Sequence, residues 1–405
     1  DKRKLILCLS DIHLGIDDSY GQFKSNRKYL HNFLSKLRFS PNLKELVFNG
    51  DLFDQWFIPG HIDTLNGESS LNFLERIVEN NKEIINDIRN IIADKEIKVT
   101  YIPGNHDMLF TSAEINSIFP GINQARDSYG LGSYTPEDLP NSIIEHGHRY
   151  DFFCAPNHIS TTEDNCDFLL PPGYFYARIS ATSFIENLRY YDDFVTDFTL
   201  ISNTYSNKNY LEYLYKSICT FSLRKCPVME SNDEKFIYTL INGYKENYCI
   251  NDLLPDLLNE DKKDSNKLFK DITLTWNKRQ IYNKVPVNIS TEAAIKYSIF
   301  HSYFDNMAQI QYFKNPQSKK RIVIFGHTHC ACMIISNNSL DQKTIYANCG
   351  SWLDKSSYPP SMTFTLLIPP KDKTSPNTFI HLYRYKGDNS IEKLQSQAVT
   401  EFSSV

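Results

Sequence analysis

The stretch IKVTYIPGNHD, residues 97–107, changes character abruptly from apolar to polar. Residues 97–102 are mostly apolar and β-branched or aromatic, which predicts a buried β-strand. A Pro-Gly break ends this run, and Asn105, His106 and Asp107 follow at once. Such side chains coordinate metal ions or exchange protons, so the end of this strand is a candidate for chemistry.

Four other segments repeat the arrangement of a short apolar run followed by polar side chains. They are KLILCLSDIH (4–13), KELVFNGDLFD (44–54), NSIIEHGH (141–148) and KRIVIFGHTH (320–329). Between the early strands lie helical patterns, and the apolar positions from Ser70 to Ala93 predict one long amphipathic helix. Strands that alternate with helices indicate an α/β core, in which ligands gather at the carboxyl ends of the strands.

The sequence predicts three consecutive parts of the chain. Residues 1–154 are expected to form the first part of the core. Residues 155–315 are rich in Tyr, Phe and Asn with short helical patterns, which predicts a mostly helical insertion that serves as a lid or cap. Residues 316–405 are expected to complete the core with the last polar loop and several antiparallel strands.

Composition places the chain among soluble globular proteins, with 405 residues, 41% hydrophobic and 22% charged. A net charge of -5 gives no overall field that would attract nucleic acid or an anionic membrane. No run of 18 apolar residues exists, so no transmembrane helix is predicted and a cytoplasmic location is expected. The chain starts at Asp1 without a signal-like stretch, which leaves open a removed leader, and peripheral contact with a membrane also stays open.

The nine cysteines are odd in number and form no C-x-x-C pair, which favours reduced and mostly buried thiols over a disulfide framework. Cys330 and Cys332 lie beside a histidine pair, so a metal role is conceivable for them. A packing role as small apolar residues is the favoured alternative.

The side chains at the five strand ends are of the kinds that bind transition metals. Mixed nitrogen and oxygen ligands without clustered thiolates suit Mn, Fe, Zn or Ni rather than Ca. A carboxylate such as Asp51 can bridge two ions, and two ions about 3.5–4 Å apart clamp both oxygens of an in-line displacement at phosphorus. Water bound to such ions ionises near neutral pH and gives a hydroxide nucleophile.

Each cluster also has a structural explanation when taken alone. The D-x-H pattern is common in loops, partly buried histidines are ordinary, and runs of Asp, Asn and Gly form turns. Five clusters in succession, each at a predicted strand end, favour one joint site over five coincidences.

The five clusters together resemble the full motif series of the calcineurin-like metallophosphoesterases. The matching motifs are Asp11-x-His13, Gly50-Asp51-x-x-Asp54, Gly104-Asn105-His106-Asp107, His146 and Gly326-His327-x-His329. They span residues 5–353, and the segment 155–315 has no counterpart. The resemblance implies a four-layer α/β/β/α sandwich that carries two divalent metal ions, with Mn²⁺ expected first and Fe, Zn or Ni as alternatives.

The resemblance also implies a ligand set for each ion. The first ion would be held by Asp11, His13, Asp51 and His329. The second ion would be held by Asp51, Asn105, His146 and His327. In this scheme Asp51 bridges the two ions.

Two further residues are the candidate catalytic residues. The resemblance implies that His106 contacts the scissile phosphate and assists the leaving group, and we expect Asp107 to orient His106 by a hydrogen bond. Asp54 is expected to support the ligands. The segment EHGHRYD offers both His146 and His148, and the family pattern favours His146, which leaves His148 as a supporting or substrate-facing residue.

The expected activity is hydrolysis of a phosphoester, as a phosphatase or as a phosphodiesterase or pyrophosphohydrolase. DIHLG and GDLFD are similar to segments of DNA-repair nucleases in this superfamily, whereas HGHRYD and NCGSWLD resemble the branch of UDP-2,3-diacylglucosamine pyrophosphohydrolases. In that branch an inserted helical lid covers a lipid-bearing nucleotide. Residues 155–300 contain 16 Lys and Arg against 19 Asp and Glu, which does not predict the basic groove of a nuclease.

A small-molecule or lipid-nucleotide substrate is therefore preferred, with a DNA or RNA nuclease and a non-catalytic scaffold as alternatives. His106 and all seven ligand candidates are present, which disfavours the scaffold. The candidate substrate contacts are His148, Arg149, Tyr174 and Arg178. Arginine can grip phosphate with two hydrogen bonds, but a role in surface salt bridges is the favoured alternative for Arg149, Tyr174 and Arg178. The aromatic residues of the insertion would line a cleft or form its own core.

Overall fold

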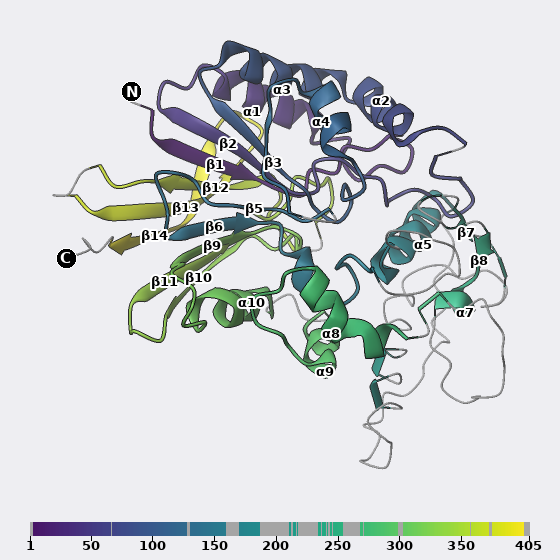
Figure 1. Cartoon of the computed structure of the whole chain (residues 1–405). Helices are drawn as coiled ribbons and strands as arrows, with labels where there is room; N and C mark the ends of the chain where they lie inside the picture. The colour runs from purple at the N-terminus through teal and green to yellow at the C-terminus, as the bar shows by residue number, and fades with distance from the viewer. Residues whose placement is uncertain are drawn as a thin grey trace. The chain divides into compact units, whose positions relative to one another are not determined.

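The computed structural model describes residues 3–400 except 66, 128–129, 159–169, 187–209, much of 212–245, 254–267, 270, 299–302, 357 and 372–374. The chain forms two compact units (Figure 1). The first unit contains Asp1–Asp54, Leu74–His148 and His301–Val405. The second contains Gln55–Phe73 and Arg149–Phe300, so it also draws on a segment from the first half of the chain. The domain limits at residues 155 and 315 stay predictions.

A seven-stranded sheet of the first unit has the order β14-β13-β12-β1-β2-β3-β4. Its strands are β1 (Leu5–Leu9), β2 (Leu43–Asn49), β3 (Lys98–Ile102), β4 (Asn123–Gln124), β12 (Thr363–Ile368), β13 (Asn377–Tyr385) and β14 (Ile391–Thr400). Strands β1 to β4 are parallel, and β12, β13 and β14 continue the sheet in antiparallel pairs. Strands β1, β2 and β3 are almost wholly buried, which explains why they read as unbroken apolar runs.

A five-stranded sheet of the same unit has the order β10-β11-β9-β6-β5. Its strands are β5 (Ser133–Tyr134), β6 (Ser142–Glu145), β9 (Ile322–Phe325), β10 (Cys332–Asn337) and β11 (Lys343–Asn348). Strands β6, β9 and β11 are parallel.

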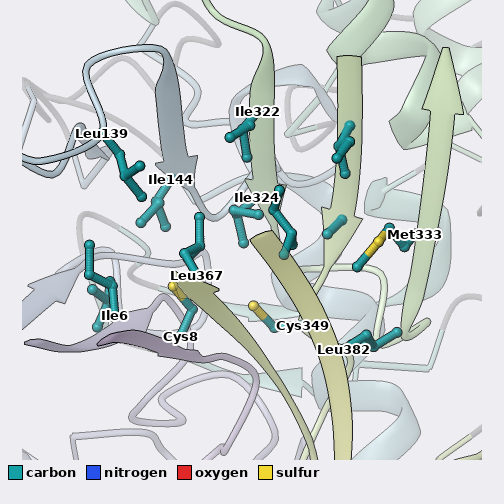
Figure 2. Packing of buried hydrophobic residues seen from close by; sticks show 14 of the residues in the cluster. Ile6, Cys8, Leu139, Ile144, Ile322, Ile324, Met333, Cys349, Leu367 and Leu382 are labelled. Carbon is teal, nitrogen blue, oxygen red and sulfur yellow. The ribbon is translucent and has the colours of Figure 1, made fainter. Parts of the chain in front are cut away.

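The inner faces of the two sheets form one apolar core. Ile6 and Leu367 of the first sheet belong to the same buried cluster as Ile144 and Ile324 of the second, and Figure 2 shows their side chains between the strands. All four are at most 1% exposed. Packing of this kind fixes the two sheets, and with them the loops that carry the polar clusters.

Helices lie on the outer faces of both sheets of this unit. The first sheet is covered by α1 (Arg27–Leu37) and α3 (Lys82–Asp94), with α4 (Ser112–Ile118) nearby (Figure 1). Phe33 of α1 packs on Phe364 of β12 with a ring-centroid distance of 5.0 Å. On the second sheet, α10 (Tyr303–Ala308) leads into a π-helical turn, η2 (Gln309–Phe313), whose Tyr312 hydroxyl donates to Glu145 (2.7 Å). The predicted α/β/β/α sandwich is therefore confirmed.

The prediction of one continuous helix from Ser70 to Ala93 is wrong. The segment from Ser70 to Ala93 forms two helices, α2 (Ser70–Asn80) and α3, instead of one. Asn81 separates them with φ -126° and ψ 32°. Its buried side-chain amide donates to the carbonyl oxygens of Gly15 (2.9 Å) and Ile77 (2.8 Å), and this competition with the backbone ends the first helix.

The second unit is mostly helical among the residues described. Its elements are α5 (Pro172–Glu186), β7 (Ile237–Tyr238), β8 (Asn247–Tyr248), α7 (Ile250–Leu253), α8 (Ile272–Tyr282) and α9 (Thr291–Tyr297), and a 3-10 turn, η1 (His148–Tyr150), precedes them. Tyr174, Phe175 and Tyr244 are at most 1% exposed and pack ring against ring, with 5.2 Å between the Phe175 and Tyr244 centroids. These aromatic residues form the unit's own core.

Within the described part of the chain, no helix is both long enough and apolar enough to cross a membrane. The six described cysteines, 8, 154, 249, 330, 332 and 349, are free thiols, and three of them are buried. Cys166, Cys219 and Cys226 lie outside the described residues.

Candidate metal centre

The carboxyl ends of β1, β2, β3, β6 and β9 carry the five polar clusters of the sequence. Backbone hydrogen bonds tie these loops to one another: the Asp11 N–H donates to the Gly50 carbonyl (3.2 Å), and the Gly326 N–H donates to the His146 carbonyl (3.1 Å). Five of the seven candidate ligands are buried, and His327 and His329 are partly exposed. The fold thus gathers side chains that are up to 318 positions apart in the sequence (Asp11 to His329).

The first ligand group contains Asp11, His13 and His329, whose ligand atoms all lie within 4.8 Å of one another. Asp11 Oδ1 is 3.2 Å from His329 Nε2 and 3.9 Å from His13 Nε2. The first and last of the five loops therefore converge on one point.

The second ligand group contains Asp51, His146 and His327, again with ligand atoms within 4.8 Å of one another. Asn105 joins it, because its Oδ1 is 3.1 Å from His146 Nε2 and 2.8 Å from His327 Nδ1. One carboxylate, one amide and two imidazoles thus face one another.

Asp51 lies between the two groups. Its Oδ2 is 3.6 Å from His13 Nε2 of the first group and 3.2 Å from His146 Nε2 of the second. Its Oδ1 points elsewhere and accepts a hydrogen bond from the His106 N–H (2.8 Å). A single carboxylate oxygen is therefore within reach of both groups.

The donor set fits divalent cations. Asp11 Oδ1 and His13 Nε2 are buried and make no hydrogen bond of good geometry with any residue that the structure describes. Buried polar atoms are normally paired, so atoms that converge without partners are typical of ligands for an ion. Burial disfavours a charged imidazole at His146, yet the Asp51 and Asp11 carboxylates outweigh it and raise the His146 pKa to about 9. These negative charges create the same attraction for a metal cation.

Half of the described non-glycine residues with positive φ lie in the ligand loops. Asp11, His13, Asp51, His327 and His329 all adopt φ between 53° and 67°, the left-handed region. Each such residue costs about 1–3 kcal/mol and is found mainly where function requires it. Gly50 permits a further close approach, because a Cβ atom there would lie 2.3 Å from His146 Nδ1.

His106 is oriented by Asp54. The His106 Nδ1 is 2.7 Å from Asp54 Oδ1, and Asp54 Oδ2 is 3.4 Å from Nδ1 of His13. Asp54 therefore joins the predicted substrate-facing histidine to a candidate metal ligand. His106 retains 14% side-chain exposure, in contrast to the buried ligands of the first loop.

The hydrogen bond expected from Asp107 to His106 is replaced by a different arrangement. The Asp107 carboxylate accepts from the backbone N–H groups of Gly104 (2.6 Å), Leu52 (3.0 Å) and Phe53 (3.3 Å). Burial and the charge of Asp51 raise the Asp107 pKa to about 6. Asp107 thus fastens the loop after β3 to the loop after β2, and its predicted catalytic role is better filled by Asp54.

The candidate substrate contacts lie in different surroundings. His148 is 2% exposed, and its ring centroid is 5.3 Å from that of His146 and 6.4 Å from that of His327. Arg149 is 6% exposed and donates from Nη1 to the Asn283 carbonyl (3.2 Å) within the second unit.

Tyr174 and Arg178 are both fully buried in the second unit. The Arg178 guanidinium donates to the Tyr174 hydroxyl (2.6 Å), to Thr64 Oγ1 (2.9 Å) and to the Ile58 carbonyl (2.7 Å). A surface salt bridge is therefore wrong for Arg178, and its contacts favour a structural role. Substrate binding by these residues stays a prediction.

Several residues that contribute to the centre were not singled out from the sequence. The Ser10 hydroxyl donates to Asp11 Oδ2 (2.5 Å), and the Asn49 carbonyl accepts from His146 Nδ1 (2.9 Å). Both residues directly precede a ligand motif, which is the only local signal they offer. The hydrogen bond with the Cys332 thiol lowers the Cys330 pKa to about 7, but neither thiol joins a ligand group within the described residues.

Comparison with known proteins agrees with this geometry. The sequence pattern of the calcineurin-like phosphoesterases (Metallophos) matches residues 4–331. The chain belongs to the calcineurin-like phosphoesterase family. Membership of this family, together with the His and Asp groups described above, supports a metal-dependent hydrolase of phosphoesters.

Other comparisons are weaker than the family match. No curated protein matches this calcineurin-like phosphoesterase. Among solved structures, it is similar to a crystal structure, in complex with alpha-ketoglutarate, of a protein from Staphylococcus aureus assigned as a 5′-nucleotidase. The identity is 10% and the TM-score 0.28, over 99% of this chain and 55% of the other. This chain thus spans about half of that protein's length, and the likeness carries no argument about substrate.

Proposed function

We propose that this protein hydrolyses phosphoesters at a dinuclear metal centre with Asp51 as the bridging ligand. The observation that carries the proposal is the position of Asp51 Oδ2, 3.6 Å from His13 Nε2 and 3.2 Å from His146 Nε2. Asp11, His13 and His329 would complete the first site, and Asn105, His146 and His327 the second. Mn²⁺ is the ion proposed first, and Fe, Zn and Ni are alternatives because mixed histidine and carboxylate sites accept all of these ions.

When bound, two divalent ions would supply a nucleophile from water near neutral pH and would neutralise charge that develops at phosphorus. The chain's part is to present the correct ligand atoms. His146 donates from Nδ1 to the Asn49 carbonyl (2.9 Å), which makes Nε2 the atom that would coordinate an ion. His13 turns Nδ1 towards Asp54 (3.4 Å) and likewise presents Nε2.

His106 is proposed to protonate the leaving oxygen. Its Nδ1 is held by the Asp54 carboxylate at 2.7 Å, which fixes the orientation of the ring and directs Nε2 away from Asp54. Although burial opposes ionisation of Asp54, the charges of His106 and His13 and their hydrogen bonds hold its pKa well below the usual value. Asp54 therefore stays ionised and can stabilise a positive charge on His106.

The proposed substrate class is a small phosphoester, with a lipid-bearing nucleotide as the finer alternative. The absence of a basic excess in residues 155–300 supports this choice over a nucleic acid. The similarity of HGHRYD and NCGSWLD to pyrophosphohydrolase segments supports the lipid-nucleotide alternative.

The test is hydrolysis of two chromogenic substrates, p-nitrophenyl phosphate and bis-(p-nitrophenyl) phosphate. Each is assayed with metal-stripped protein and again after Mn²⁺ is restored. Turnover that requires Mn²⁺ is expected, and the preferred ester separates phosphatase from phosphodiesterase activity. Protein that binds two ions but hydrolyses neither ester, nor UDP-diacylglucosamine, nor single-stranded DNA, would contradict the enzymatic proposal and favour a scaffold.

A further inference from the structure

The two oxygens of the Asp11 carboxylate have different surroundings. Oδ2 accepts hydrogen bonds from the Ser10 hydroxyl (2.5 Å) and from the His327 N–H (3.0 Å). Oδ1 lies 3.2 Å from His329 Nε2 and is left without a well-formed hydrogen bond in the described part of the chain. One oxygen is therefore anchored, and the other is presented to the first ligand group.

The space for the Ser10 hydroxyl depends on Gly326. Ser10 is 1% exposed, and a Cβ atom on residue 326 would lie 1.9 Å from Ser10 Oγ and 2.7 Å from Asp11 Oδ2. Any side chain at that position would expel the hydroxyl or the carboxylate. The last histidine loop is thus shaped around this hydrogen bond.

The Ser10 hydroxyl can donate to only one of two nearby acceptors, and the stronger acceptor receives its proton. The hydroxyl carries one proton, and its oxygen has two acceptors nearby, Asp11 Oδ2 at 2.5 Å and the Asn49 carbonyl at 2.7 Å. The Asn49 carbonyl also accepts from His146 Nδ1 (2.9 Å), and its two lone pairs allow both hydrogen bonds, so acceptor strength decides. An ionised carboxylate is the stronger acceptor, so the proton is directed to Asp11.

We propose that Ser10 is a positioning residue that fixes the Asp11 carboxylate so that Oδ1 faces the first metal site. This inference rests on the proposed dinuclear function. Ser10 acts through its hydrogen bond to Asp11 and is not proposed as a ligand. Loss of a partner that orients a ligand typically weakens metal binding about 10–100-fold, and here the loss should fall on the first site.

The test compares Ser10→Ala with Ser142→Ala. Ser142 is a matched control, because it is also a fully buried serine of the first unit whose hydroxyl donates to a backbone carbonyl, that of Leu139 (2.8 Å). Full-length protein is stripped of metal and titrated with Mn²⁺ by calorimetry and by electron paramagnetic resonance. Wild type and Ser142→Ala are expected to take up two ions and to show the signal of a coupled Mn pair.

Ser10→Ala is expected to fill one site with wild-type affinity and the other about 10–100-fold more weakly. At two equivalents of Mn²⁺ it should show the signal of an isolated ion, which general loosening of the fold would not produce. Unchanged affinity at both sites, or equal loss at both, would overturn the role of Ser10.

A second variant covers the case in which Ser10→Ala does not fold. Ser10→Cys retains a weak donor of similar shape, so its first site should be weakened less than that of Ser10→Ala, and its second site not at all. Unchanged affinity of the first site in a folded Ser10→Cys protein would count against the proposal. Fewer than two ions in the wild type would contradict the proposed function itself, whereas two ions bound with the same affinities in the wild type and in Ser10→Ala would contradict only the role of Ser10.

Discussion

Asp11 in the first unit and Arg178 in the second are both charged and completely buried, yet their surroundings are opposite. Arg178 donates to hydroxyls of Thr64 and Tyr174 and to carbonyl oxygens of residues 58, 59, 60, 62 and 238. Asp11 keeps Oδ1 free of hydrogen bonds of good geometry to the described residues, although three imidazoles lie within 4 Å of that oxygen. A buried charge whose hydrogen bonds are all formed stabilises the fold. A buried charge with an atom that lacks a hydrogen bond, surrounded by other ligand atoms, is typical of a site that binds an ion.

Arg279 shows that incomplete pairing alone does not make a site. It is fully buried, and among the described residues its Nε and Nη1 have no hydrogen-bond partner. Burial lowers its pKa to about 10. Its guanidinium lies over the rings of Phe152 and Trp276, with 5.5 Å and 5.1 Å to the centroids. What distinguishes the centre in the first unit is that several ligand atoms of both chemical kinds converge within 4.8 Å.

The substitution expected to have the largest effect is Asp51→Asn. It removes the negative charge that both ligand groups share, so both ions should be lost and turnover should fall by more than about 100-fold, beyond the usual cost of losing a supporting residue. Metal content by inductively coupled plasma mass spectrometry, measured beside activity, checks this. Retention of two ions per chain would exclude Asp51 as the bridge.

His106→Ala should separate catalysis from metal binding. Because His106 contributes a proton and is not proposed as a ligand, the variant should keep two ions and lose about 10²–10⁴-fold in kcat. Asp54→Asn should keep the imidazole but lose the carboxylate 2.7 Å from Nδ1, so its kcat should fall less than that of His106→Ala. Near-normal turnover in His106→Ala would contradict the proposed proton transfer, and loss of an ion would place His106 among the ligands.

The sequence was sufficient to predict the α/β core, because buried parallel strands read as short apolar runs and each of the five ended in polar residues. It did not locate the partner of His106. Asp107 is adjacent in sequence, but the loop after β3 turns that carboxylate towards the backbone of Gly104 and Leu52. Asp54, 52 positions away, takes the place instead. Local spacing identifies which residue types a site uses, while the hydrogen bonds between loops depend on tertiary packing that no single segment encodes.

The same limit explains the helix that was predicted as continuous. The apolar face from Ser70 to Ala93 is uninterrupted in sequence, and the break at Asn81 depends on the Gly15 carbonyl, 66 positions earlier. Arg178 is a third case. An arginine in an aromatic-rich segment suggested a substrate contact or a surface ion pair, and only the fold shows how many carbonyl oxygens converge on it.

Arg178→Met tests whether the buried Arg178 stabilises the fold. It retains apolar bulk but removes every hydrogen bond of the guanidinium, which leaves buried carbonyl oxygens unpaired and should lower the free energy of unfolding by about 3 kcal/mol. Urea denaturation followed by fluorescence measures this, and the metal content of the folded protein should not change. Arg38→Ala, which removes a surface pair with Asp94 and a contact with the Phe39 ring, is the control and should change the free energy of unfolding by less than about 1 kcal/mol. Loss of an ion from folded Arg178→Met would contradict a purely structural role of Arg178.

The smallest of these effects, stabilisation by a single metal ion, bears most directly on Asp11. If Oδ1 of Asp11 and the strained ligand loops bind metal ions, Mn²⁺ at 100 times its dissociation constant should raise the free energy of unfolding by about 2.7 kcal/mol for each ion bound. This gain in the free energy of unfolding should persist in Arg178→Met, which keeps every ligand. It should disappear in Asp51→Asn, because that variant lacks the negative charge that both ions require. Thermal unfolding of the three proteins with and without Mn²⁺ measures it. A wild type that gains nothing from Mn²⁺ would mean that the unpaired atoms of Asp11 and His13 resemble those of Arg279, tolerated by the fold without a ligand.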